Sequence, residues 1–122
     1  MRHIYFKAFP LKALEQPLVL SEFGGYSYLL QEHCYSLHYQ HGYGFFKDME
    51  ALTDKIIEAY EEMVLQSLKE GLCGSIYTQL SDVEDEVNGL YTYDRKRCKV
   101  NKEKLHRLSQ AVYKAYDNAC DQ

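Results

Sequence analysis

Two short apolar runs separated by an amphipathic segment constrain this chain more than any other feature of its sequence. The first run, PLVLSEF at 17–23, ends at a Gly-Gly pair, and the second run, LCGSIYTQL, spans 72–80. Continuous apolar runs of this length are typical of strands that are buried on both faces. Two such strands that flank a helix predict a right-handed parallel crossover, and therefore an α/β protein.

Two segments carry the spacing of an amphipathic helix. After Asp48, which can cap a helix, apolar residues recur three or four positions apart until Gly71. The same pattern follows Asn101. The predicted elements, in chain order, are a strand at 18–23, a helix at 48–70, a parallel adjacent strand at 72–79 and a helix at 101–118.

The segments between these elements are predicted to be loops. Residues 26–46 carry Tyr, His and Gly without regular periodicity, and residues 81–95 are rich in acidic side chains. Within the acidic loop, Asn88 and Gly89 are predicted to form a tight turn. The whole order amounts to two successive βα units, about a quarter of a (β/α)8 barrel of ~250 residues.

Composition limits the class of protein. With 122 residues, 46% hydrophobic and 26% charged, the chain fits one soluble globular domain. The net charge is −4, so nucleic acid is not an expected partner. We interpret the short basic run at 95–99 as a solvated turn. No apolar stretch approaches the ~20 residues that a membrane span needs, so no membrane is expected either.

The four cysteines lie far apart, without a CxxC pair or a histidine at metal-ligand spacing. This pattern predicts neither a zinc site nor a disulfide framework. Cys73 lies in the second apolar run and is interpreted as a buried small hydrophobe. Free thiols favour a reducing compartment, and we therefore expect a cytoplasmic protein. No metal or organic cofactor is expected.

Glu22 is the candidate for catalytic chemistry. A carboxylate near the end of an apolar strand is costly to bury unless it is paired or lies in a cleft. In a (β/α)8 barrel this position opens into the active site. The two glycines that follow allow a loop backbone to pass close to a ligand. The same pattern also fits a Glu22 that is solvated or paired with a basic residue, and an acidic loop that is a solvated face.

Three segments carry a resemblance to a known family. PLVLSEFGGYSY, GYGFFKD and YTQLSDVEDEVNGLYTYDR resemble the end of the catalytic barrel in glycoside hydrolase family 2, the family of β-galactosidases, β-glucuronidases and β-mannosidases. The resemblance covers residues 4–116 and is most specific at 77–95. It implies that 1–122 is the C-terminal part of such a barrel, with the strand of Glu22 as the seventh and the next strand as the eighth.

The resemblance also implies roles for individual residues. It implies a retaining β-glycosidase that acts on carbohydrate, in which Glu22 is the nucleophile and forms the glycosyl-enzyme intermediate. Residues at or after the end of the second strand would line or brace the sugar pocket, namely Thr78, Gln79, Asp82, Glu84 and Asn88. The family's acid/base glutamate follows an asparagine on a fourth strand that this sequence lacks. We therefore expect the isolated chain to be inactive.

Two other classes of function stay open. The chain could be a non-catalytic carbohydrate-binding or assembly module whose aromatic loop, 26–46, stacks on sugar or protein. It could also be a truncated remnant that is stable only by association. A barrel quarter leaves two open sheet edges, so we expect a homo-oligomer formed through those edges.

Overall fold

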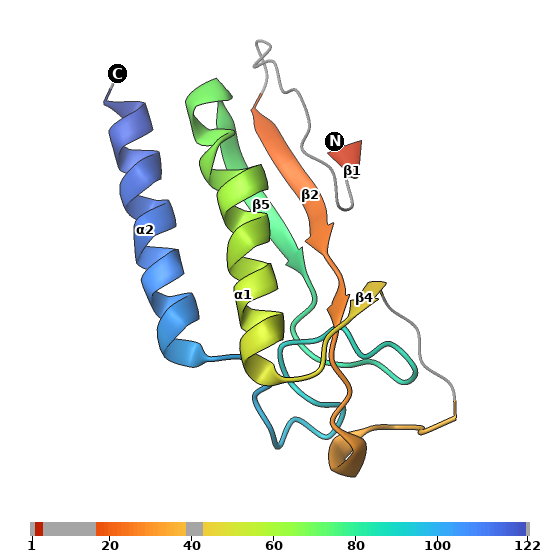
Figure 1. Ribbon diagram of the computed structural model, residues 1–122. Coiled ribbons are helices and arrows are strands. Elements are labelled where there is room, and N and C mark those ends of the chain that lie inside the picture. The colour runs from red at the N-terminus through yellow and green to blue at the C-terminus, as the bar shows by residue number, and fades with distance from the viewer. Residues whose placement is uncertain (1, 4–16, 39–42, 122) are drawn as a thin grey trace.

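The computed structural model describes residues 2–3, 17–38 and 43–121 (Figure 1). Part of the segment that carries the resemblance, 4–16, and part of the aromatic loop, 39–42, lie outside the described residues. The elements in chain order are β1 (Arg2–His3), β2 (Leu18–Gly24), β3 (Tyr26–Ser27), η1 (Gln31–His33), β4 (Tyr43–Phe45), α1 (Met49–Ala59), η2 (Tyr60–Leu65), η3 (Leu68–Glu70), β5 (Leu72–Thr78) and α2 (Lys102–Cys120).

A small parallel sheet organises the fold, with the strand order β1-β2-β5. The predicted strands are confirmed, since β2 and β5 are adjacent and parallel, with Leu18 opposite Leu72 and Gly24 opposite Thr78. The helical segment of α1 and η2 connects them, as predicted. The structure is therefore a mixed α/β fold with a parallel sheet and two main helices. The loops that follow the strands gather at the carboxyl ends of β2 and β5 (Figure 1).

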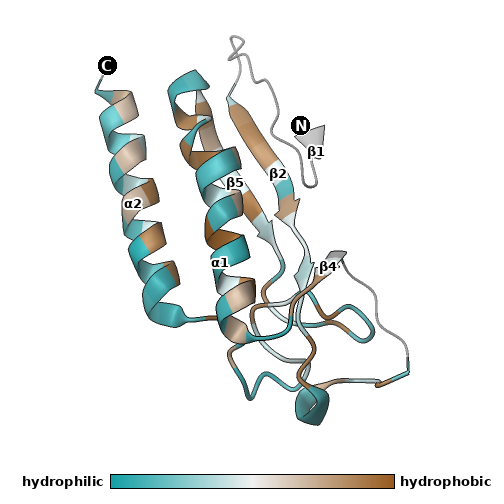
Figure 2. Ribbon diagram, viewed as in Figure 1, coloured by the Kyte–Doolittle hydropathy of each residue, from teal (hydrophilic) through white to brown (hydrophobic). Residues whose placement is uncertain are grey.

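One face of the sheet carries the hydrophobic core. Leu20 and Phe23 of β2 and Leu72 of β5 pack with buried residues of α1 and η2. Figure 2 shows the two-faced character of both helices and the predominantly hydrophobic β2. On β5, Ile76 is 58% exposed, so the sheet presents an apolar side chain outside this core.

The register between β2 and β5 is irregular between Leu20 and Phe23. In a regular strand, two residues three positions apart point to opposite faces. Both Leu20 and Phe23 are nevertheless buried in the same core. The irregularity explains how they share that core, because a bulge re-aims side chains. Glu22 lies within this segment.

The first predicted helix changes type along its length. The α-helix ends at Ala59, a π-helical segment covers Tyr60–Leu65, and a single 3-10 turn follows at Leu68–Glu70. Gly71 closes the segment at a φ of 100°, as expected for a glycine that ends a helix. The π-helical segment buries two consecutive residues, Met63 and Val64.

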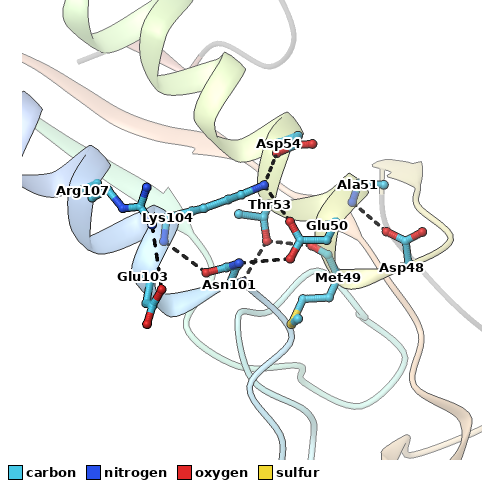
Figure 3. A network of polar contacts seen from close by, with 10 residues as sticks. All are labelled: Asp48, Met49, Glu50, Ala51, Thr53, Asp54, Asn101, Glu103, Lys104 and Arg107. Carbon is cyan, nitrogen blue, oxygen red and sulfur yellow. Dashed lines mark hydrogen bonds and ion pairs between the residues drawn. The ribbon is translucent and has the colours of Figure 1, made fainter.

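The starts of the two helices are joined by a polar network (Figure 3). Asp48 caps α1 by accepting from the Ala51 amide at 2.8 Å, and Asn101 caps α2 by accepting from the Lys104 amide at 3.2 Å. Both caps are the residues that the sequence predicts.

Glu50 ties one helix to the other. Its carboxylate accepts from Asn101 at 3.1 Å and from Lys104 at 2.7 Å, and these hydrogen bonds hold the pKa of Glu50 below its ordinary value. Thr53, which is fully buried, accepts from the backbone amide of Asn101 at 2.9 Å. The entry to α2 is thereby fixed against α1.

One sequence prediction about a loop and one about a cysteine are corrected. The segment predicted as an irregular loop, 26–46, contains the parallel pair β3 and β4 and the short η1. Cys73 is exposed, because strand alternation places it away from the core that holds Leu72. All four cysteines are free thiols.

Candidate functional site

Glu22 and Thr78 meet at the carboxyl ends of the two central strands. The Thr78 hydroxyl donates a hydrogen bond to Glu22 Oε1 at 3.3 Å. Both residues are partly buried, and they lie on neighbouring parallel strands at the same end of the sheet. The prediction that the strand of Glu22 and the start of the acidic loop share one end of the sheet is confirmed. Here a carboxylate held by a neighbouring hydroxyl stays within reach of solvent.

The two glycines after Glu22 shape the exit from β2. Gly24 and Gly25 have φ angles of 96° and 81°, which are unfavourable for other residues. A side chain on Gly24 would also overlap the ring of Tyr77 on β5. The Gly25 amide donates to the Thr78 carbonyl at 2.9 Å, so the turning chain stays joined to the end of β5.

Gln79 connects the end of β5 to the acidic loop. Its side-chain amide donates to Asn88 Oδ1 at 2.6 Å and to Glu86 Oε2 at 3.0 Å. The peptide bond between Thr78 and Gln79 is cis. Asn88 is buried, and its carbonyl accepts from the backbone amide of Gln79 at 3.4 Å. Of the predicted sugar-binding residues, Gln79 directly follows Thr78 in the chain, and Gln79 and Asn88 contact each other.

Asp82 is buried and forms an ion pair with Lys99 at 2.7 Å. Lys99 Nζ also donates to the Val87 carbonyl at 2.9 Å, and the Gly89 amide donates to Asp82 Oδ1 at 2.8 Å. Burial raises the pKa of Asp82 and lowers the pKa of Lys99, against the opposing effect of their mutual attraction. The contacts of Asp82 brace the loop.

The sequence interpretation of the basic run is wrong at one position. Arg95, Lys96 and Arg97 are exposed, as expected of a solvated turn, but Lys99 is fully buried. Its apolar neighbours Cys98 and Val100 are the only sign of this in the sequence. Sequence reasoning missed Lys99 because its partner Asp82 lies seventeen positions away.

The tight turn of the acidic loop is displaced from its predicted place. Val83 and Glu86 exchange backbone hydrogen bonds at 3.1 Å and 2.9 Å, so the turn lies at Glu84 and Asp85. Glu84 is exposed there at a φ of 51°. Gly89 serves a different purpose, since any side chain at this position would overlap the backbone of Ser81 and Asp82.

The described residues contain no group of three or more His, Cys, Asp or Glu placed to hold a metal ion. No helix in that part of the chain is long and apolar enough to span a membrane. No protein-family model matches the sequence. A search of curated proteins likewise gives no match. The fold and the site thus define a mixed α/β protein with a carboxylate–hydroxyl pair at the carboxyl end of a parallel sheet.

Proposed function

We propose that this chain is the C-terminal part of the catalytic barrel of a retaining β-glycosidase of the glycoside hydrolase family 2 type, with Glu22 as the nucleophile. The observation that carries the proposal is the hydrogen bond from Thr78 to Glu22 at the carboxyl ends of adjacent parallel strands. This is the end of the strands at which (β/α)8 barrels place their active sites. The parallel order β1-β2-β5 is compatible with a segment of such a barrel.

In this mechanism a Glu22 oxygen attacks the anomeric carbon of a β-glycoside. The bond between that carbon and the leaving-group oxygen breaks while a second carboxylic acid protonates that oxygen. Water, deprotonated by the same second group, then hydrolyses the glycosyl ester and restores Glu22. The second group must lie ~5–5.5 Å from the nucleophile, and the resemblance implies that it comes from a strand that this sequence lacks.

Thr78 and Gln79 have supporting roles in the proposal. A donated hydrogen bond fixes the orientation of a carboxylate and stabilises its charge, and Thr78 supplies one to Glu22. Gln79 and Asn88 form an amide pair at the start of the loop, where amide groups can meet sugar hydroxyls. Asp82 and Lys99 hold this loop in place through their buried ion pair.

The test uses activated substrates, since they need little help from a general acid. Nitrophenyl β-galactoside, β-glucuronide and β-mannoside are incubated with the purified chain and with the longer gene product that carries this segment. The chain alone should show no turnover, because the missing acid/base group alone costs about 10²–10⁴-fold. The longer product should hydrolyse at least one substrate and lose that activity in Glu22→Gln.

A mechanism-based label identifies the nucleophile directly. A dinitrophenyl 2-deoxy-2-fluoroglycoside forms a long-lived ester with the nucleophile of a retaining enzyme, which peptide mass spectrometry then locates. We expect the label on Glu22 of the longer product. Glu61→Gln, which changes an exposed glutamate of η2, is the matched control and should be labelled normally. A label on another carboxylate, or full activity of Glu22→Gln, would overturn the proposal.

A further inference from the structure

Two exposed tyrosine rings from different loops lie against each other. Tyr35 follows η1, and Tyr93 belongs to the loop after β5. Their ring centroids are 5.2 Å apart with an angle of 61° between the planes, and the two residues are 55% and 37% exposed. Nothing in the proposed mechanism uses them. Large aromatic side chains that stay exposed together on ordered loops are candidates for ligand contact.

A hydrogen bond between His33 and Asp94 joins the two loops that carry the tyrosines. His33 Nδ1 lies 2.7 Å from Asp94 Oδ2, two positions before Tyr35 and one position after Tyr93. Asp94 also accepts from the Thr92 hydroxyl at 2.6 Å and from the Lys96 amide at 3.0 Å. These hydrogen bonds, with that from Thr92 as the largest cause, hold the pKa of Asp94 well below its ordinary value. The carboxylate therefore stays charged at neutral pH and can accept the hydrogen bond from His33.

The turn that carries Tyr93 is anchored in the protein interior. Thr92 is fully buried, and its backbone exchanges hydrogen bonds with the Arg97 carbonyl at 3.0 Å and the Arg95 amide at 2.9 Å. The Arg95 guanidinium lies 6.0 Å from the Tyr93 ring centroid. The two loops are therefore already ordered before a ligand binds. This lowers the entropic cost of binding at this surface.

The surroundings of the rings favour a small polar ligand over a protein partner. Arg95, Lys96 and Arg97 are exposed beside Tyr93, and on the same loop Asp94 contacts His33 of the loop that carries Tyr35. A stable protein interface needs a larger area with few charges at its centre. A pyranose ring fits better, because its C–H face can lie on an aromatic ring while its hydroxyl groups reach charged neighbours.

The position of the pair agrees with this chemistry. The two loops follow β2 and β5, whose carboxyl ends hold Glu22 and Thr78, and both loops lie at that end of the sheet (Figure 1). We infer that Tyr35 and Tyr93 form a carbohydrate-binding platform, separate from Glu22, that stacks on a pyranose ring. The platform needs no catalytic activity, so it can be tested even if the proposed nucleophile is wrong.

Saturation-transfer NMR on the purified chain tests the platform, with methyl β-galactoside, β-glucuronide and β-mannoside as probes. This method detects weak ligands and tolerates a self-associated protein. We expect at least one glycoside to receive saturation, most strongly at the protons of one face of its ring. An open-chain hexitol, which lacks a rigid C–H face, should receive little.

The variants separate stacking from folding. Tyr35→Ala and Tyr93→Ala should each weaken binding by about tenfold, the effect of losing one aromatic contact. Tyr35→Phe keeps the ring and should bind the sugar within about threefold of the original protein. The lost hydroxyl group could give the sugar only one solvent-exposed hydrogen bond. Tyr113→Ala, which removes a tyrosine of α2 that is 71% exposed, is the matched control and should change nothing.

Each outcome decides the matter. Binding that survives in both alanine variants, or no saturation of any glycoside, would overturn the platform. Loss of binding in Tyr35→Phe and Tyr113→Ala as well would show a general loss of folded protein and would also count against it. The platform is measured by sugar binding to the purified chain, whereas the nucleophile is measured by turnover and labelling of the longer product, so failure of the nucleophile and failure of the platform are distinguishable. Weaker self-association in both alanine variants, without sugar binding, would assign the rings to a protein interface.

Discussion

Lys99 Nζ lies 2.7 Å from Asp82 Oδ1, and both side chains are withdrawn from solvent. The pair joins the start of the acidic loop to the segment that leads into α2. It also holds the Val87 carbonyl and the Gly89 amide, so two backbone groups of the loop depend on the two charges. Paired charges of this kind add little net stability, but each makes the other indispensable.

Removal of Lys99 alone should therefore be severe. Lys99→Met leaves the Asp82 carboxylate buried without its cation, and we expect a loss of about 3–5 kcal/mol in the free energy of unfolding. Adding Asp82→Asn should recover part of that loss, because the neutral amide oxygen still accepts from the Gly89 amide. Urea unfolding followed by circular dichroism measures both. A double variant less stable than Lys99→Met would contradict this account.

The damage caused by Lys99→Met should depend on pH. Burial already raises the pKa of Asp82 in the folded protein, and loss of the cation raises it further. A folded-state pKa above the unfolded value means that the folded state binds the proton more tightly. Lowering the pH through the acid range should therefore narrow the stability gap between Lys99→Met and the original protein. A gap that is constant from neutral to acidic pH would contradict the prediction.

Gly89 should tolerate no side chain. Gly89→Ala places a methyl group against the backbone of Ser81 and Asp82, so the loop must move, at a cost of about 1–3 kcal/mol or more. The matched control is Gly74→Ala on β5, where the new methyl group would meet only the Val19 methyls at 3.6 Å. Thermal unfolding of both variants provides the comparison. Equal losses for the two would show that the close approach at Gly89 does not matter.

The isolated chain should self-associate through its sheet. Within the described residues β5 pairs only with β2, and a cavity of about 510 Å³ lies between β5 and α2, lined by residues such as Leu72, Leu108 and Val112. Unpaired strand edges beside apolar surface recruit other chains. Sedimentation velocity at micromolar concentration should show dimers or larger species.

A single charge should weaken that association. Ile76→Lys places a charge on β5, whereas Leu37→Lys places one at an equally exposed apolar residue, also 58% exposed, in the loop after η1. Only Ile76→Lys should shift the distribution toward monomer. A monomer in the unaltered protein, or equal effects of the two lysines, would refute the role of the sheet.

The sequence by itself determined the two central strands and the two main helices, but not β3, β4 and η1. Apolar runs, helical periodicity and the capping residues Asp48, Gly71 and Asn101 are local signals, and they correctly placed both central strands and both helices. The parallel pairing followed because a helix of that length leaves the second strand running in the same direction as the first. Glu22 at a strand end was also visible in the sequence.

Only the tertiary structure decided what the charged and aromatic side chains do. Lys99 is buried because Asp82 lies opposite it. Tyr35 meets Tyr93 because the contact between His33 and Asp94 joins their loops, and Cys73 is exposed because alternation turns it outward. Each of these outcomes depends on contacts between residues far apart in the chain or on which strand face is covered. Composition and local periodicity contain no information about such distances.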